Sequence, residues 1–216
     1  MTQTPFDILK QTCNDACHER HACVAGYKQM IKSENVSQMM ATWRNNWEDV
    51  VQGKFADIIH EKLPEQYPFI REEMHKAGIY MNKCPDDANS NTLVIITDSD
   101  TPIHIYGEAK AYVLGQAEVV VHDHAQIYNQ RFNANITLLD YAYGNIQSGM
   151  VTAQGRSTLN CACCATIDGA VKVTAYGGTV KAIKYRSIEA YRDTVVYSKT
   201  DCNIKVSGTS KIISNE

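Results

Sequence analysis

The spacing of apolar residues changes along the chain, from a helical period in its first part to a period of two in its second part. In the first part, apolar residues recur every three, four or seven positions, which is typical of amphipathic helices. We expect about three helices here: one from Phe6 to about Ile31, a second with Ser37 as its N-cap that ends at Pro64, and a short third over residues 68–76.

A linker follows the helical segment. Gly78 stands where a left-handed C-terminal cap would end the third helix, and residues 82–91, NKCPDDANSN, have the composition of turns. We therefore divide the chain into a helical segment with its linker, residues 1–91, and a second part, residues 92–216.

The second part repeats with a period of eight residues. Aligning its segments gives sixteen units, most of them eight residues long, which begin at residues 93, 101, 109, 117, 125, 134, 142, 149, 157, 165, 173, 178, 186, 194, 202 and 210. The third position is apolar in every unit except one, where it is Gly144. The first position is mostly small, and the seventh is often Gly, Asp or Ser. The unit at residues 173–177 is cut to five residues.

This pattern predicts a parallel β-solenoid. Positions one, three and five of a unit lie on one side of an extended strand, and the seventh position can make a turn. A single unit buries almost nothing, whereas stacked units would align their third positions in a continuous internal ladder. The predicted fold class is α+β, a helical segment followed by a single-stranded parallel β-helix of about sixteen units. Two or three units per coil both fit, and a β-sandwich, the alternative fold, does not explain the fixed period.

The two tryptophans suggest a role for the helical segment. Trp43 and Trp47 lie one helical turn apart on an apolar stripe. The open end of a solenoid exposes strand edges and core that must be covered. We therefore expect the helical segment to cap the first coil.

Three short motifs carry a resemblance to other proteins. AYGN at 142–145, AYGG at 175–178 and AY at 190–191 resemble the Ala-x-Val-x-Ala-Tyr-Gly-Asn octads of uncharacterised bacterial and phage-encoded proteins. Those proteins also place a helical segment ahead of the repeats, and the resemblance implies a β-solenoid but no activity. The repeats are more loosely similar to those of the hexapeptide acyltransferases, which build a left-handed β-helix and use a histidine base. That repeat has six residues, and all seven histidines here lie at or before His124.

Composition and charge argue against several classes of function. The net charge is −3, without the basic excess that phosphate neutralisation needs, so we expect no nucleic-acid binding. No apolar run is long enough for a signal peptide or a membrane span, so we expect a cytoplasmic protein without membrane contact. In that reducing compartment the eight cysteines would be thiols or ligands rather than disulfides.

A cluster of Cys and His residues near the N-terminus is the first candidate for chemistry. Cys13, Cys17 and His21 are spaced by four and share one stripe of the predicted helix, so they could bind Zn²⁺ with Cys84 as a fourth ligand. The alternative is that Cys13 and Cys17 pack as small apolar residues. We favour packing, because the paired Cys-x-x-Cys signature of zinc sites is absent.

Two further groups within the repeats invite a functional interpretation. His122 and His124 lie two residues apart at outward positions, where a pair could bind a metal ion weakly or simply be solvated. The segment NCACCAT places Cys161 inward and Cys163 and Cys164 at a corner. No histidine lies near these thiols in the sequence, so we favour packing over catalysis.

Most of the twelve tyrosines fall at outward positions or corners of the repeats. We select Tyr112, Tyr128 and Tyr143 as candidates for partner binding, since Tyr112 and Tyr128 would form an exposed column in a two-unit coil. Aromatic rows suit sugar rings or a protein partner. The alternative is that the rings pack on one another.

These observations together predict a non-enzymatic structural or recognition module, of the kind a phage or other mobile element encodes. Its rigid solenoid face would bind a protein or glycan partner, without a cofactor, and a homo-oligomer is one possible assembly. Two alternatives stay open. One is a β-helix enzyme of the acyltransferase or polysaccharide-cleaving type, although the sequence shows no catalytic cluster; the other is a metal-dependent adaptor that uses the Cys/His helix.

Overall fold

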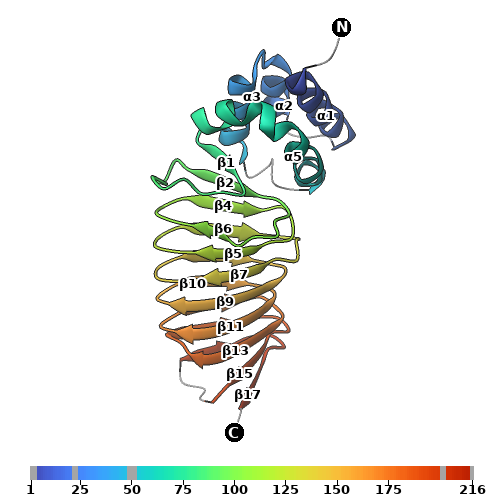
Figure 1. The fold of residues 1–216 in the computed structure, drawn as a ribbon. Helices are drawn as coiled ribbons and strands as arrows, with labels where there is room; N and C mark the ends of the chain where they lie inside the picture. The colour runs from blue at the N-terminus through green and yellow to red at the C-terminus, as the bar shows by residue number, and fades with distance from the viewer. Residues whose placement is uncertain (1–3, 21–23, 48–52, 200–202, 215–216) are drawn as a thin grey trace. The chain divides into compact units, whose positions relative to one another are not determined.

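The computed structural model describes residues 4–20, 24–47, 53–199 and 203–214 (Figure 1). The chain forms two compact units, Met1–Met81 and Asn82–Glu216, which are described separately. Helices make up most of the first unit, and parallel strands stacked as a β-solenoid make up the second. The predicted α+β class, a helical segment followed by a parallel β-solenoid, is confirmed.

The first unit has four described helices where about three were expected. These are α1 (Pro5–Arg20), α2 (Val24–Lys32), α3 (Val36–Asn45) and α5 (Gly53–Lys76), followed by the short strand β1 (Ile79–Met81). Helix α5 packs against α1 and α3, and α2 packs against the same two helices. The core of this unit is built from large side chains that are almost fully buried, among them Leu9, Met39, Met40, Trp43, Ile59, Leu63 and Met74.

Two predicted helix ends are wrong. The N-cap of α3 is Asn35 rather than Ser37: Asn35 has an extended backbone, and its side-chain oxygen accepts a hydrogen bond of 3.0 Å from the Gln38 N–H. An asparagine at this point satisfies one of the free N–H groups of the first turn, which leaves Ser37 inside the helix. Pro64 does not end a helix either, because α5 continues through Pro64 and Pro68 to Lys76.

Helix α5 can continue through Pro64 and Pro68 because both prolines lie on its solvent-exposed side. Pro64 and Pro68 are both exposed, one turn apart on α5. A proline inside a helix leaves one carbonyl without its usual N–H donor, and on an exposed face water can supply the missing bond. Gly78 does end the helical segment as predicted, with φ of +72° and its N–H donating to the His75 carbonyl over 2.9 Å.

The described residues of the second unit form sixteen strands that alternate between two sheets (Figure 1). In chain order they are β2 (Leu93–Ile96), β3 (Ile103–Ile105), β4 (Lys110–Val113), β5 (Glu118–Val121), β6 (Gln126–Asn129), β7 (Asn135–Leu138), β8 (Tyr143–Ile146), β9 (Met150–Gly155), β10 (Thr158–Cys161), β11 (Cys164–Gly169), β12 (Lys172–Ala175), β13 (Thr179–Lys184), β14 (Ser187–Ala190), β15 (Val195–Ser198), β16 (Ile204–Val206) and β17 (Lys211–Ser214). The even-numbered strands pair in the order β2 to β16 and the odd-numbered strands in the order β3 to β17. Each coil therefore contains two units, one in each sheet.

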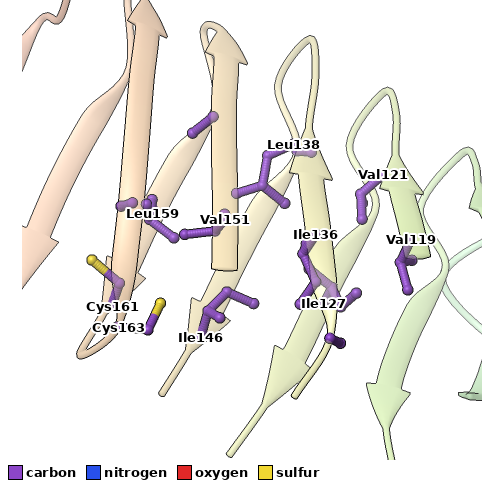
Figure 2. Close-up of a cluster of buried hydrophobic side chains, with 14 of the residues drawn as sticks. Val119, Val121, Ile127, Ile136, Leu138, Ile146, Val151, Leu159, Cys161 and Cys163 are labelled. Carbon is purple, nitrogen blue, oxygen red and sulfur yellow. The ribbon is translucent and has the colours of Figure 1, made fainter. Parts of the chain in front are cut away.

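Apolar side chains from both sheets fill the space between them (Figure 2). Val119, Ile136 and Val151 lie side by side on three successive odd-numbered strands, as the internal ladder requires. The one glycine of the ladder, Gly144, lies beside Ile127 and Leu159 on the even-numbered strands. A Cβ atom at Gly144 would come within 2.7 Å of Leu138 Cδ1, so the Leu138 side chain already fills this place in the core.

The first unit of the repeat has a different register from the predicted one. Val94, not Ile95, pairs with the inward residue Ala111, and Ile95 lies beside Tyr112 on the other side of the sheet. All four residues of β2 are buried and apolar. A strand without polar residues has no alternation to mark its inner face, so the sequence pattern could not fix the register here.

The units predicted to begin at 165 and 173 also change. Ala165 lies between Val151 and Val180, so it takes the place in the ladder that was assigned to Ile167. Val173 likewise pairs with Leu159 two strands earlier in the chain. A shift of two residues keeps every inward side chain inward, which is why the hydrophobic pattern did not reveal it. The predicted five-residue unit does not exist. The shorter spacing is divided between two corners, since Ala165 follows Leu159 by six residues after β10 and Val180 follows Val173 by seven after β12.

The corners depend on residues that tolerate a left-handed backbone. Gly107, Asp123, Asp140 and Gly155, all predicted turn positions, have φ between +50° and +65°. The carboxylate of Asp123 accepts a hydrogen bond of 3.0 Å from the Gly107 N–H, and that of Asp140 accepts one of 3.3 Å from the Asp123 N–H. These aspartates therefore bond each turn to the neighbouring coil, and Asp123 has the structural role that its position predicted.

The internal ladder gives a direct test of the fold. Val119 is fully buried between the sheets, whereas its neighbour Val120 points outward and is half-buried. We expect Val119→Asp to lower the free energy of unfolding by several kcal/mol, because it buries a carboxylate without a partner. Val120→Asp, the matched control, should cost about 1 kcal/mol or less. Urea denaturation followed by circular dichroism measures both, and equal stabilities of the two variants would contradict the register.

Candidate functional site

The outward side chains of the solenoid form two faces. We call the outward side chains of β2 to β16 the even-strand face and those of β3 to β17 the odd-strand face. Because successive coils pair in parallel, outward residues at one position of the repeat line up in rows that cross the strands. The candidate site residues belong to these rows.

Two histidine rings meet on the odd-strand face. His104 Nδ1 and His122 Nε2 are 3.0 Å apart, and the two rings are nearly parallel, with their planes 17° apart. His104 lies in β3, and His122 follows β5, where its N–H donates to the Ile105 carbonyl over 2.9 Å. Tyr106 stacks on the His122 ring with 4.7 Å between the centroids. A hydrogen bond between two ring nitrogens needs one donor and one acceptor, so one of the two bridging nitrogens carries a proton.

A second stack lies across the neighbouring turn. His124 stacks on Tyr141 with 5.1 Å between the ring centroids, and Arg156 Nη1 donates to the Tyr141 hydroxyl over 3.3 Å. His122 and His124 were selected as a pair, but each contacts a ring from another coil instead, and Asp123 makes the turn between them.

Sequence reasoning did not single out His104, whose partner His122 lies 18 residues further along the chain. A sequence signal for this contact exists once two units are known to form a coil, because outward residues about sixteen positions apart then become neighbours. His104 and Val120, for example, are paired directly across β3 and β5.

A hollow of about 490 Å³ lies on the odd-strand face, over strands β7, β9, β11 and β13. Its centre is a row of three threonines followed by a lysine, and a second row runs beside it. The first row is Thr137, Thr152, Thr166 and Lys181, and the second includes Asn135, Met150 and Cys164. The described lining offers hydroxyl groups, an amide, a thioether, a thiol and one cation, but no histidine or carboxylate that could transfer a proton.

Exposed apolar side chains occur on both sides of the solenoid; on the even-strand side they are Tyr176, which follows β12, and Val206 in the last even-numbered strand. On the odd-strand face, Met150 is 58% exposed and Ile183 is 66% exposed, and Tyr106 is also exposed. Tyr141 is exposed at the adjoining corner. The central outward row of the even-strand face is polar over most of its length, with Asn145, Asn160, Thr174, Glu189 and Lys205 in succession.

The selected tyrosines belong to the even-strand face. Tyr112 and Tyr128 point outward, as predicted, since their neighbours Ala111 and Ile127 are in the core. The two rings stack with 4.9 Å between centroids, and Tyr143 lies tilted beside Tyr128 at 6.0 Å. The expected exposure is wrong for Tyr112, which is only 9% exposed. Because stacked rings cover one another's faces, this row presents ring edges outward.

The hydroxyl groups of this row are also engaged. The Tyr128 hydroxyl donates to Gln126 Oε1 over 2.8 Å, and the Tyr143 hydroxyl accepts from Asn160 Nδ2 over 2.9 Å. Tyr128 and Tyr143 are each half-buried. The rings of Tyr112, Tyr128 and Tyr143 therefore pack on one another, as the alternative prediction for these tyrosines stated.

The cysteine cluster packs in the core, with one exception. Cys161 points inward as predicted, and Cys163, which was predicted at a corner, is also buried in the core (Figure 2). Burial raises the pKa of Cys161 to about 12 and that of Cys163 to about 11. Both thiols therefore stay protonated at neutral pH and are poor nucleophiles. Cys164 is exposed on the odd-strand face.

The proposed zinc ligands fall into different parts of the chain. Cys13 is buried in the helical unit, and Cys84 is buried in the core of the solenoid, where burial raises its pKa. The side chains of Cys17 and His21 lie outside the part of the chain that the structure describes. Among the residues that are described, no three His, Cys, Asp or Glu side chains come together as metal ligands.

Comparisons with known family models, curated proteins and solved structures give no match. None of the described helices combines the length and apolar character that crossing a bilayer requires.

Thiol reactivity tests the positions of the three clustered cysteines. We expect iodoacetamide at pH 8 to modify Cys164 rapidly and to leave Cys161 and Cys163 unmodified in the folded protein. Raising the pH to 9 should not expose the buried pair, because both thiols stay protonated until the pH approaches their raised pKa values of about 11 and 12. Mass spectrometry of tryptic peptides resolves the sites, with Cys164→Ser as the control. Modification of Cys161 as fast as Cys164 would show that this strand is misplaced.

Proposed function

We propose that the protein is a non-enzymatic recognition module that binds a protein partner through its odd-strand face. The observation that carries this proposal is the hollow itself, with Met150, 58% exposed, in its lining and Ile183, 66% exposed, two residues along β13 from the lining residue Lys181. Exposed apolar patches on folded proteins commonly mark interaction sites. Tyr, Met and Arg are also the residue types enriched at protein interfaces, and Tyr141, Met150 and Arg156 lie on this side of the solenoid.

The solenoid also fixes the geometry of this face before a partner arrives. Each of its strands pairs in parallel with the strand one coil away, with a register shift between β11 and β13 after Ile167, and the turn aspartates bond neighbouring coils. Binding to a surface that is already ordered costs less conformational entropy than ordering a loop on binding. A rigid row of side chains is therefore suited to recognition.

A protein is favoured over a glycan by the way the rings are arranged. Sugars commonly pack on the open face of an aromatic ring, and here Tyr106 is stacked on His122 and Tyr141 on His124. What the face offers instead is Met150 and Ile183, two aliphatic side chains that are more than half exposed. A protein interface can bury such side chains.

Binding is also the activity that the hollow supports chemically. Its described lining offers no pair of groups for acid–base transfer. The buried thiols nearest to it in the sequence, Cys161 and Cys163, are protonated at neutral pH. A recognition role needs only the shape and the side chains that are present.

Site-specific photocrosslinking tests the proposal. A benzoylphenylalanine at Met150, in the cells that naturally produce the protein, should crosslink to a discrete polypeptide. The same probe at Lys172, which is exposed on the even-strand face, should not. Thr152→Arg, which fills the hollow, should abolish the Met150 adduct, whereas Thr174→Arg, a matched change on the even-strand face, should leave it.

Adducts of equal yield from both faces would overturn the choice of face. If Met150 gives no polypeptide adduct and a glycan array shows binding that Thr152→Arg removes, the face is right and the partner class is wrong. The cytoplasmic location, the likeness to phage-encoded proteins and a homo-oligomeric assembly stay predictions.

A further inference from the structure

The hollow on the odd-strand face has hydrogen-bonding groups that the protein itself leaves unused. Thr137, Thr152 and Thr166 lie side by side on β7, β9 and β11, and each is half-buried. Within the described part of the chain, none of their three hydroxyl groups has a hydrogen-bond partner. Thr194, by contrast, donates its hydroxyl to the Tyr191 carbonyl over 2.7 Å. The centre of the hollow therefore offers a row of free donors to a ligand.

The same row continues within the hollow to a positive charge. Lys181 lies beside Thr166 on one side and beside Tyr197 on the other, so neither neighbour in the sheet is a carboxylate. The Lys181 side chain is exposed, and no carboxylate belongs to the described lining. Asp168, on the adjoining strand, is paired across the strands with Lys184 instead. The hollow therefore carries one positive charge that forms no ion pair with a described residue.

Together these groups fit an anionic group that accepts hydrogen bonds. An ammonium group only donates, whereas a hydroxyl can donate or accept. A carboxylate only accepts, and it carries one negative charge, which Lys181 alone can balance. A phosphate is less suited, since it carries about 1.5 to 2 negative charges at neutral pH and is commonly bound by clustered arginines. The described lining contains no arginine.

From these groups we propose that the partner of the odd-strand face places an acidic side chain in the hollow, where its carboxylate pairs with Lys181 and accepts a hydrogen bond from the Thr166 hydroxyl. Neighbouring strands lie about 4.8 Å apart, so one carboxylate reaches both side chains. Met150, in the same lining, supplies apolar contact area beside this polar centre. The inference rests on the proposed recognition function and names the chemistry of the partner.

Charge variants of Lys181 test this inference, with the benzoylphenylalanine probe at Met150 in the cells that naturally produce the protein. Lys181→Met should lower the yield of the polypeptide adduct roughly fivefold, the size expected for a partly exposed ion pair. Lys181→Glu should lower it more than about tenfold, because it sets two carboxylates against each other. Lys181→Arg should keep the yield within about twofold, since the charge is retained. Lys172→Glu changes the net charge equally on the even-strand face and, as the control, should leave the yield unchanged.

Circular dichroism checks that each variant is folded, as expected for changes at an exposed position. An adduct that Lys181→Glu leaves unchanged, or that Lys181→Arg abolishes as well, would overturn the inference and leave the recognition function standing. If the probe at Met150 gives no adduct while Lys181 is intact, the recognition function fails and the inference fails with it. Loss of the adduct when a lysate of the same cells is treated with phosphatase before irradiation would show that the anion is a phosphate, and would overturn the choice of a carboxylate.

Discussion

The in-register parallel pairing of each strand with the strand one coil away is the constraint on which the rest of the structure depends. It sets neighbouring strands about 4.8 Å apart, so a side chain at one position of the repeat meets the same position of the next coil, except where β11 and β13 shift register after Ile167. Inward positions thereby become the ladder of Val119, Ile136 and Val151. Outward positions become the rows that stack His122 on Tyr106 and align the threonines of the hollow. Core and candidate sites are two results of the same backbone hydrogen bonds.

Most of the fold could be predicted because the sequence shows both the alternation of apolar and polar residues within a strand and the eight-residue repeat between strands. The failures have a common physical origin. In β2 every residue is apolar, so nothing distinguished Val94 from Ile95 as the inward residue. Around Ile167 a shift of two residues left the inward set unchanged. The hydrophobic pattern indicates which side of a strand is buried, but it does not determine the exact register. It also does not indicate that a helix continues through an exposed proline such as Pro64.

The candidate site was less predictable than the fold, since it depends on contacts between coils. Tyr112 and Tyr128 were placed side by side because they are sixteen residues apart, and they do stack. His104 and His122 are eighteen residues apart and lie diagonally across the sheet, a contact that the sixteen-residue spacing of the coils does not predict. Exposure was likewise not encoded locally: Tyr112 and Tyr106 both occupy outward positions, yet only Tyr106 is exposed.

The carboxylates of the turn residues Asp123 and Asp140 accept hydrogen bonds from backbone N–H groups of the preceding coil. The Asp123 carboxylate bonds the turn at Gly107, and the Asp140 carboxylate bonds the turn at Asp123, so these two turns are held by the coil that follows them. In a one-dimensional model of the stack, these bonds contribute to the nearest-neighbour interface energies, which add to the intrinsic stability of each coil. Where a coil lacks such a carboxylate, backbone bonds alone must link the corner to its neighbour. At Gly155, which has no side chain to offer, the N–H of the next residue, Arg156, donates to the Asp140 carbonyl over 2.6 Å and so links the corner to the preceding coil.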